Sequence, residues 1–167
     1  MKFYERYHSR PRELRQIGLG LWLLCVFTQK ILRIDAGFPF LKNFTSRALA
    51  TNISVENNSW SVRKSFIVNG GCYYHTHAGI KIGEGTIWSY GVKMITLDHV
   101  MKSLDEGASR GEIVIGRNCW IGAGSVILGG VVLGDNTIVG ANSVVNKSFE
   151  DGNIVIAGSP AKIIKTL

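Results

Sequence analysis

An aliphatic residue recurs at every sixth position in the C-terminal half of this 167-residue chain. The positions are Ile115, Ile121, Ile127, Leu133, Val139 and Val145. A period of six matches neither the 3.6 residues of an α-helix nor the 2 of a half-buried strand. It fits a short strand followed by a turn, repeated so that the aliphatic side chain always points inward and three units close one triangular coil. The repeat therefore predicts an all-β solenoid whose stacked coils pair parallel strands.

The glycines support this interpretation. The chain has 20 of them, without the strict third-residue spacing of collagen. Four directly follow a repeat aliphatic, namely Gly116, Gly122, Gly134 and Gly140. Because glycine adopts corner conformations without steric cost, we expect it at the turns of the coil.

The repeat continues toward the N-terminus with one interruption. Ile82, Trp88 and Met94 keep the six-residue step, but the interval from Met94 to Ile115 is longer than one coil. The excess predicts a loop over residues 97–112, and loops on a rigid scaffold often carry chemistry. The same step predicts one earlier, less regular coil at Val62, Val68, Tyr74 and Ile80.

The first fifty residues lack the repeat and carry most of the net charge. They hold nine of the 19 Lys and Arg residues and three of the 12 Asp and Glu residues. We therefore predict a helical segment at 1–50 and a β-helix domain at 51–167 that ends in a short tail. Since the β-helix domain is nearly neutral, a nucleic-acid partner is not expected.

The apolar run from residue 17 to 28 is too short for the ~20 residues of a spanning helix. No small-residue cleavage site of a signal peptide follows it. Two alternatives stay open. Residues 10–35 form a helix at an anionic membrane surface, or a helix packed on the protein itself. We favour packing.

The cysteines predict a reducing environment. Cys25, Cys72 and Cys119 are odd in number and form no CxxC pair, so neither a disulfide framework nor a zinc ribbon is encoded. We therefore expect a cytoplasmic protein. His75 and His77 point the same way on a strand, but His99 lies at no coil spacing from them, and we predict no metal.

Three segments and one histidine resemble the hexapeptide-repeat acyltransferases. The segments are NCWIGAGSVIL (118–128), VVLGDNTIVGANSVVNK (131–147) and AGSPAK (157–162), and the histidine lies alone in the predicted loop. The resemblance covers about residues 66–165. It implies a left-handed parallel β-helix that works as a homotrimer and takes acetyl-CoA as co-substrate.

The same resemblance implies roles for individual residues. His99, which titrates near neutral pH, matches the family's general base, and Asp98 or Glu106 would orient it. The amide of Ala123 would stabilise the oxyanion. The CoA groove would comprise Trp120, Gly122, Ala123, Gly140 and Ala141, with Lys147 and Lys162 near the phosphates. Lys162 stands where the family often has Arg, and Asn146 stands where it has Thr.

Aromatic side chains predict the acceptor site. We expect Tyr73, Tyr74, His75 and Trp88 to line a cleft near His99, because aromatic faces stack on sugar rings; plain packing is the alternative. The predicted function is acetyl transfer to a saccharide hydroxyl in surface polysaccharide biosynthesis. Two alternatives stay open: a small acceptor such as serine, an amino sugar or an antibiotic, or a non-catalytic trimeric scaffold.

Overall fold

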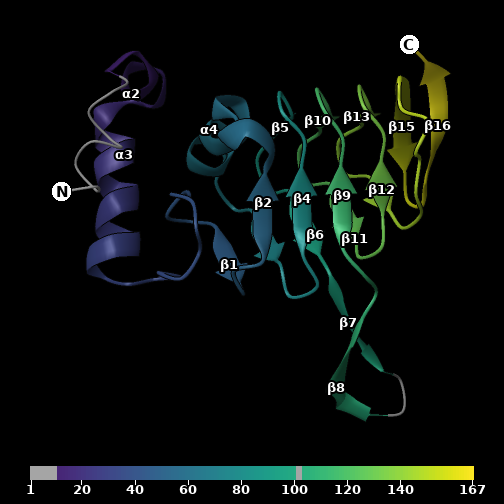
Figure 1. Cartoon of the computed structure of the whole chain (residues 1–167), viewed down its shortest axis with the longest axis horizontal. Helices are drawn as coiled ribbons and strands as arrows, with labels where there is room; N and C mark the ends of the chain where they lie inside the picture. The colour runs from purple at the N-terminus through teal and green to yellow at the C-terminus, as the bar shows by residue number, and fades with distance from the viewer. Residues whose placement is uncertain (1–10, 101–102) are drawn as a thin grey trace.

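The computed structural model describes the backbone of residues 11–100 and 103–167, and the side chains of residues 14–97 and 110–167. Within these ranges the chain forms a parallel β-helix with helices at one end and a hairpin on its side (Figure 1).

Three sheets form the walls of the β-helix. The first sheet comprises β1 (Arg47–Leu49), β3 (Tyr73–His75), β6 (Lys93–Ile95), β11 (Val126–Leu128) and β14 (Val144–Val145). The second comprises β2 (Ile53–Val55), β4 (Ile80–Ile82), β9 (Ile113–Ile115) and β12 (Val132–Leu133). The third comprises β5 (Ile87–Trp88), β10 (Trp120–Ile121), β13 (Ile138–Val139), β15 (Ile154–Gly158) and β16 (Ala161–Thr166). Within these three sheets, only β16 is antiparallel to its neighbour, β15.

The predicted inward aliphatics form the core. All six repeat positions from Ile115 to Val145 are buried. Each lies directly beside its equivalent in the next coil, as Ile121 does beside Val139 and Ile127 beside Val145. The six-residue prediction is therefore confirmed for this part of the chain, where every coil buries one aliphatic from each wall.

Close stacking explains the corner glycines. A Cβ on Gly83 would lie 2.5 Å from the carbonyl carbon of Gly116 in the next coil, and a Cβ on Gly122 would lie 2.6 Å from the Ala141 nitrogen. The neighbouring backbone leaves no room for a side chain at these corners.

A helix replaces the expected strand in the first coil. After β2 and the turn η2 (Glu56–Asn58), the chain forms α4 (Trp60–Val68). The prediction of an earlier coil was therefore wrong at Val62 and Val68, although Tyr74 and Ile80 do lie on strands. Val62 and Phe66, four residues apart, share the buried face of α4, so the helical period prevails.

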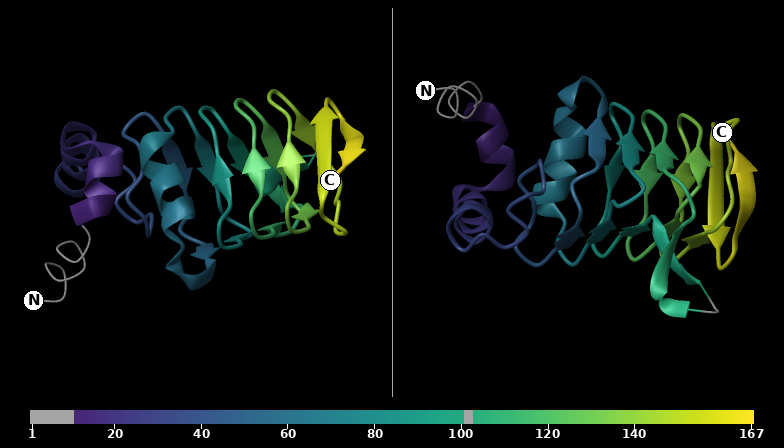
Figure 2. Two further views of the ribbon diagram at one scale, coloured as in Figure 1. Left: turned by 90° about the horizontal axis from the view of Figure 1, so that it is seen from above. Right: turned by 60° about the horizontal axis from the view of Figure 1, so that its bottom comes forward.

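The N-terminal segment lies at the end of the β-helix beside α4 (Figures 1 and 2). It comprises α2 (Pro11–Ile17), α3 (Leu19–Val26) and the π-helix η1 (Phe27–Ile31). Ile17 and Cys25 pack on Ile67 of α4, which is the packed helix that we favoured. No helix among the described residues is long and apolar enough to cross a bilayer.

Buried polar contacts fix this segment to the β-helix. The side-chain amide of Gln29 donates to the carbonyls of Phe38 and Phe40 and accepts from the Lys42 N–H. The Lys42 Nζ lies 3.2 Å from Asp35 Oδ2, and Asp35 accepts from the backbone of Ala48 in β1. Burial acts to raise the pKa of Asp35, but hydrogen bonds from Ala48, Arg47 and Lys42 outweigh it and lower that pKa. Since β1 pairs with β3, the solenoid begins at Arg47, just before the predicted boundary at residue 50.

Candidate active site

A hairpin projects where the loop over residues 97–112 is predicted. It consists of β7 (Leu97–Val100) and β8 (Ser103–Ser109), which pair antiparallel (Figure 2, right). His99 lies on β7 opposite Gly107, and Asp98 lies opposite Ala108. The side chains of Asp98, His99 and Glu106 are outside the described residues, so their roles stay predictions.

Thr96 anchors the base of this hairpin. Its hydroxyl donates to the His75 carbonyl at 2.8 Å and accepts from the Ala78 N–H at 3.0 Å. Its carbonyl accepts from the Arg110 N–H on the returning strand at 3.3 Å. The fully buried Thr96 therefore joins both hairpin strands to the preceding coil. Our sequence reasoning missed it, although a threonine directly before the interruption of the repeat was a usable signal.

A different corner, between the third and first sheets, carries a row of stacked residues that we call the corner row: Gly70, Tyr90, Ala123 and Ala141. The residue after each of the last three donates across the coils to this row. The N–H groups of Gly91, Gly124 and Asn142 bond to the carbonyls of Gly70, Tyr90 and Ala123 at 3.0, 2.9 and 2.8 Å. These bonds keep the row residues of successive coils in line along this corner.

The corner row leaves backbone donors free. Ala123 and Ala141 are exposed, and within the described part of the chain their N–H groups donate no hydrogen bond. The Gly122 N–H, in contrast, is bonded to the Val139 carbonyl at 2.8 Å. A free N–H beside a small side chain is what an oxyanion donor requires, so the geometry suits the predicted role of Ala123.

The other predicted CoA residues lie near this row or beyond it. Trp120 on β10 is about half exposed. Gly122 and Gly140 flank the row as close-packed corner residues. Lys147 lies over the Phe149 ring, 5.4 Å from its centroid, and Lys162 is exposed on β16. Two cations toward the C-terminal end and free donors further back suit an extended ligand with phosphates at one end.

The structure does not bring His99 and Ala123 together within one chain. The corner row precedes the strands of the first sheet, whereas the hairpin follows β6 of that sheet. A three-residue strand separates the two corners by about 10 Å at ~3.3 Å per residue. One chain therefore carries the two predicted catalytic residues on different corners of the β-helix.

The prediction for the acceptor residues requires correction. Tyr74 and Trp88 are only 0% and 3% exposed, and the Trp88 Nε1 donates to the Tyr74 hydroxyl at 2.9 Å. Both rings pack on Phe66 inside the β-helix, so they cannot line a cleft. Burial also raises the pKa of Tyr74 well above its ordinary value. The prediction failed for Tyr74 because side chains alternate along a strand. Tyr74 points inward between the outward residues Tyr73 and His75.

Tyr73 and His75 remain candidates for the acceptor. The two rings lie 6.2 Å apart on the outer face of β3, and the buried His75 Nδ1 has no hydrogen-bond partner among the described residues. His77 follows at the next corner, with its ring 6.3 Å from that of His75. No group of three metal-ligating side chains occurs among the described residues. The three cysteines are buried and free, and burial raises the pKa of the Cys25 and Cys119 thiols.

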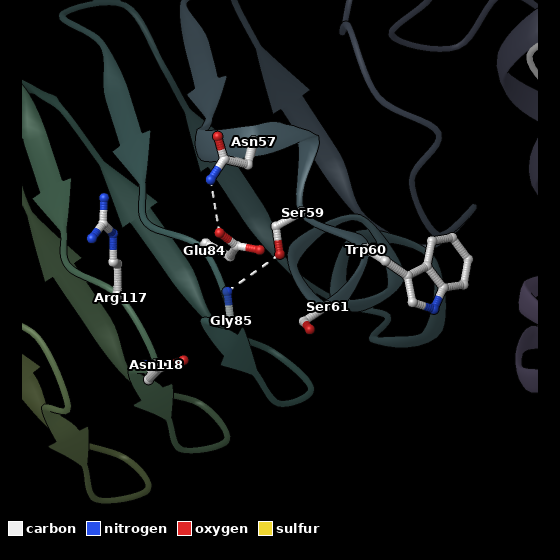
Figure 3. A pocket seen from close by; sticks show the side chains of 8 residues that line it. All are labelled: Asn57, Ser59, Trp60, Ser61, Glu84, Gly85, Arg117 and Asn118. Carbon is white, nitrogen blue, oxygen red and sulfur yellow. Dashed lines mark hydrogen bonds between the residues drawn. The ribbon is translucent and has the colours of Figure 1, made fainter.

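A polar hollow on the remaining corner is a separate feature (Figure 3). It lies between the start of α4 and the corners that join the second and third sheets. Asn57 donates to Glu84, and the Gly85 N–H donates to the Ser59 hydroxyl. Beside it, hydrogen bonds from Arg117 lower the pKa of Glu56 to about 2. Of the two charged residues that line the hollow, Arg117 pairs with Glu56 and Glu84 accepts from Asn57. The hollow lies apart from both the hairpin and the corner row.

Comparison with known proteins identifies the repeat. Residues 112–147 match the family described as bacterial transferase hexapeptide, with six repeats. The chain is also 37% identical over 145 residues to a Dictyostelium discoideum protein provisionally named an acetyltransferase. The chain belongs to the hexapeptide-repeat family. The alignment covers 85% of this hexapeptide-repeat protein but 65% of that relative, so the chain spans less than two thirds of its length.

Solved structures of hexapeptide-repeat proteins share the fold. An acetyltransferase of Vibrio cholerae, complexed with acetyl-CoA, is 22% identical and aligns over 96% of this chain and 91% of its own, with a TM-score of 0.63. A maltose O-acetyltransferase of Clostridium difficile is 23% identical over 93% and 87%, with a TM-score of 0.59. The predicted family resemblance and the left-handed parallel β-helix are therefore confirmed.

Proposed function

We propose that this hexapeptide-repeat protein is an acetyl-CoA-dependent O-acetyltransferase that acts on a saccharide hydroxyl. The observation that carries the proposal is the corner row, in which the Ala123 N–H is a free donor beside small side chains. Further support comes from the relatives, whose names are those of acetyltransferases and include a maltose O-acetyltransferase and a protein with acetyl-CoA bound.

The chemistry is a direct transfer. His99 accepts the proton of the acceptor hydroxyl while that oxygen attacks the thioester carbon. The oxyanion that develops on the carbonyl oxygen accepts a hydrogen bond from the Ala123 N–H. When the tetrahedral species collapses, the carbon–sulfur bond breaks and the CoA sulfur takes the proton from the imidazolium. No acyl-enzyme is needed, since binding both substrates in one cleft supplies proximity.

CoA would lie along the corner row. Its phosphates would be near Lys147 and Lys162, and its pantetheine arm would pass Ala141 before the thioester reaches Ala123. The outward Tyr73 and His75 of the first sheet would contact the sugar, because that sheet lies between the corner row and the hairpin. We place the reaction in the cytoplasm, in the making of a surface polysaccharide.

The active assembly in this proposal is a homotrimer. One copy has the hairpin and the corner row on different corners, so a single chain leaves each half of the site incomplete. In a closed ring of three copies, every hairpin would reach the corner row of its neighbour, and all sites would be equivalent.

The decisive experiment follows the release of the CoA thiol from acetyl-CoA with a panel of saccharides. His99→Ala should lower kcat about 10²–10⁴-fold, since it removes the general base. His77→Ala, which changes a histidine one coil earlier, should keep the rate within a few-fold. Near-normal turnover by the folded His99→Ala protein would exclude the mechanism. Failure of the unmodified protein to bind CoA in calorimetry would instead favour the non-catalytic scaffold.

A further inference from the structure

The N-terminal helices expose an unusual amount of apolar surface. Of the fifteen large apolar side chains that are exposed among the described residues, seven lie within one short segment of α3, η1 and the turn after them. We call this the apolar face. It comprises Leu19, Leu23, Leu24, Phe27, Ile31, Leu32 and Ile34.

The apolar face is opposite the face that packs on the protein. Ile17 and Cys25 pack on α4, with Leu21 between them on the same side. Leu19, Leu23 and Phe27 follow the same four-residue spacing, but they lie on the other side of α3. A helix that is apolar all round is normally covered on all sides. Here one side of the helix is covered and the other is not.

This exposure is fixed by the structure rather than produced by a loose chain end. The Gln29 side chain, only 1% exposed, ties η1 to the carbonyls of Phe38 and Phe40. Within α3 and η1 the Thr28 hydroxyl donates to the Leu24 and Cys25 carbonyls. The apolar face is therefore rigid and has its local hydroxyl satisfied, as contact with an apolar phase requires.

Charge identifies what covers the face. Residues 14–34 contain no Asp or Glu. Among the described side chains, the exposed charged residues beside the face are Arg15, Lys30 and Arg33. Asp35, which follows Ile34, is paired with Lys42 and Arg47. Helices that lie at a membrane surface combine leucine and phenylalanine on one side with basic residues that meet anionic head groups. We propose that this face docks the protein on an anionic lipid bilayer, as a peripheral contact.

The position of the helices agrees with such a contact. They lie at the end of the β-helix, and the hairpin leaves its side farther along the axis (Figures 1 and 2). A bilayer that touches the apolar face leaves the first sheet, the hairpin and the corner row in water. Docking therefore localises the protein without covering the candidate active site.

The test uses the full chain and co-sedimentation with vesicles. One set contains phosphatidylcholine with phosphatidylglycerol, and the other contains phosphatidylcholine alone. The protein should bind the anionic set more tightly, by about fivefold for each basic side chain near the surface. Added salt should weaken that preference. Replacing Arg15, Lys30 and Arg33 together by Gln should remove it, whereas Lys165→Gln on β16 should not.

A matched pair of isoleucines tests the apolar contact. Ile31 of the apolar face and Ile164 of β16 are both 65% exposed. Ile31→Glu should weaken vesicle binding about tenfold or more, since it places a carboxylate against lipid, and Ile164→Glu should leave binding within about twofold. Leu19→Glu, at a position that is 63% exposed, repeats the test if Ile31→Glu does not fold.

Three outcomes would overturn the proposal. The first is no binding of the folded protein to anionic vesicles. The second is an equal loss of binding in Ile31→Glu and Ile164→Glu. The third is a smaller assembly mass for Ile31→Glu in light scattering without vesicles, which would assign the face to contacts between copies. CoA thiol release measured without lipid keeps this test separate from that of the proposed function.

Discussion

Of the two corners that border the first sheet, one repeats regularly in every coil and the other is interrupted. The corner before the sheet repeats without interruption from Tyr90 to Ala123 and Ala141, and each coil adds the same hydrogen bond. The corner after the sheet is interrupted once, by the hairpin between β6 and β9. The regular corner offers a straight row of backbone donors, whereas the interrupted corner brings a new side chain away from the wall. In this solenoid the repeat builds the corner row of backbone donors, and the interruption of the repeat supplies the predicted reactive side chain.

Blocking the regular corner should have the largest effect. Ala123→Leu places a branched side chain beside the free N–H, and we expect kcat to fall about 10²–10³-fold, as when an oxyanion donor is lost. Ala123→Ser keeps the corner small and should retain most of the rate. The measurement is CoA thiol release, with circular dichroism to show that both variants fold. Equal rates for Ala123→Leu and the unmodified protein would separate this corner from the chemistry.

Mixing two inactive variants tests whether the corners of different copies meet. His99→Ala lacks only the imidazole on the interrupted corner. Ala123→Leu has only its corner row blocked. When they are co-expressed in equal amounts, about a quarter of the sites in a closed ring would combine an intact hairpin with an intact corner row. The mixture should therefore recover about a quarter of the activity. If each chain formed its own site, the mixture would stay as inactive as its components.

Tyr90, the one large residue of the corner row, allows a more specific test with a smaller expected effect. The Tyr90 ring lies over Gly70 and Gly71, where added Cβ atoms would approach it to 2.9 Å. With the thioester at Ala123 and the phosphates toward Lys147, the acyl group points toward Tyr90. Tyr90→Ala should raise the rate with butyryl-CoA relative to acetyl-CoA about tenfold. Tyr90→Phe keeps the ring and should keep the preference. An unchanged ratio in Tyr90→Ala would show that the acyl group does not extend toward this coil.

The sequence predicted the regular part of the fold well because one rule governs it. Every inward aliphatic from Ile115 to Val145 is buried as expected, and the long interval after Met94 marks the hairpin. The rule failed at α4, where Val62 and Val68 match a six-residue step although the segment follows a helical period. Such short segments satisfy both patterns, and the aromatic core at the end of the β-helix decides between them.

The candidate site was less predictable, for two reasons. Tyr74 and Trp88 are aromatic residues that suit a sugar cleft by type, but the direction of each side chain depends on strand register. Trp88 lies at the same repeat position as Ile121 and should have been assigned to the core. The separation of the hairpin from Ala123 depends on which corner each occupies, and their meeting depends on a second copy, which the sequence of one chain does not describe.

The last strand also covers the edge of the third sheet. A stack of parallel strands ends in a row of unpaired backbone groups, to which the strand of another molecule could add, and repeated addition would produce a fibril. Because β16 runs back along β15, it covers that row with a strand of opposite direction whose exposed residues include Lys162 and Lys165. Lysines on an outermost strand disfavour further pairing. The third sheet is thus protected against edge-to-edge association at its C-terminal end, whereas the first and second sheets end in β14 and β12.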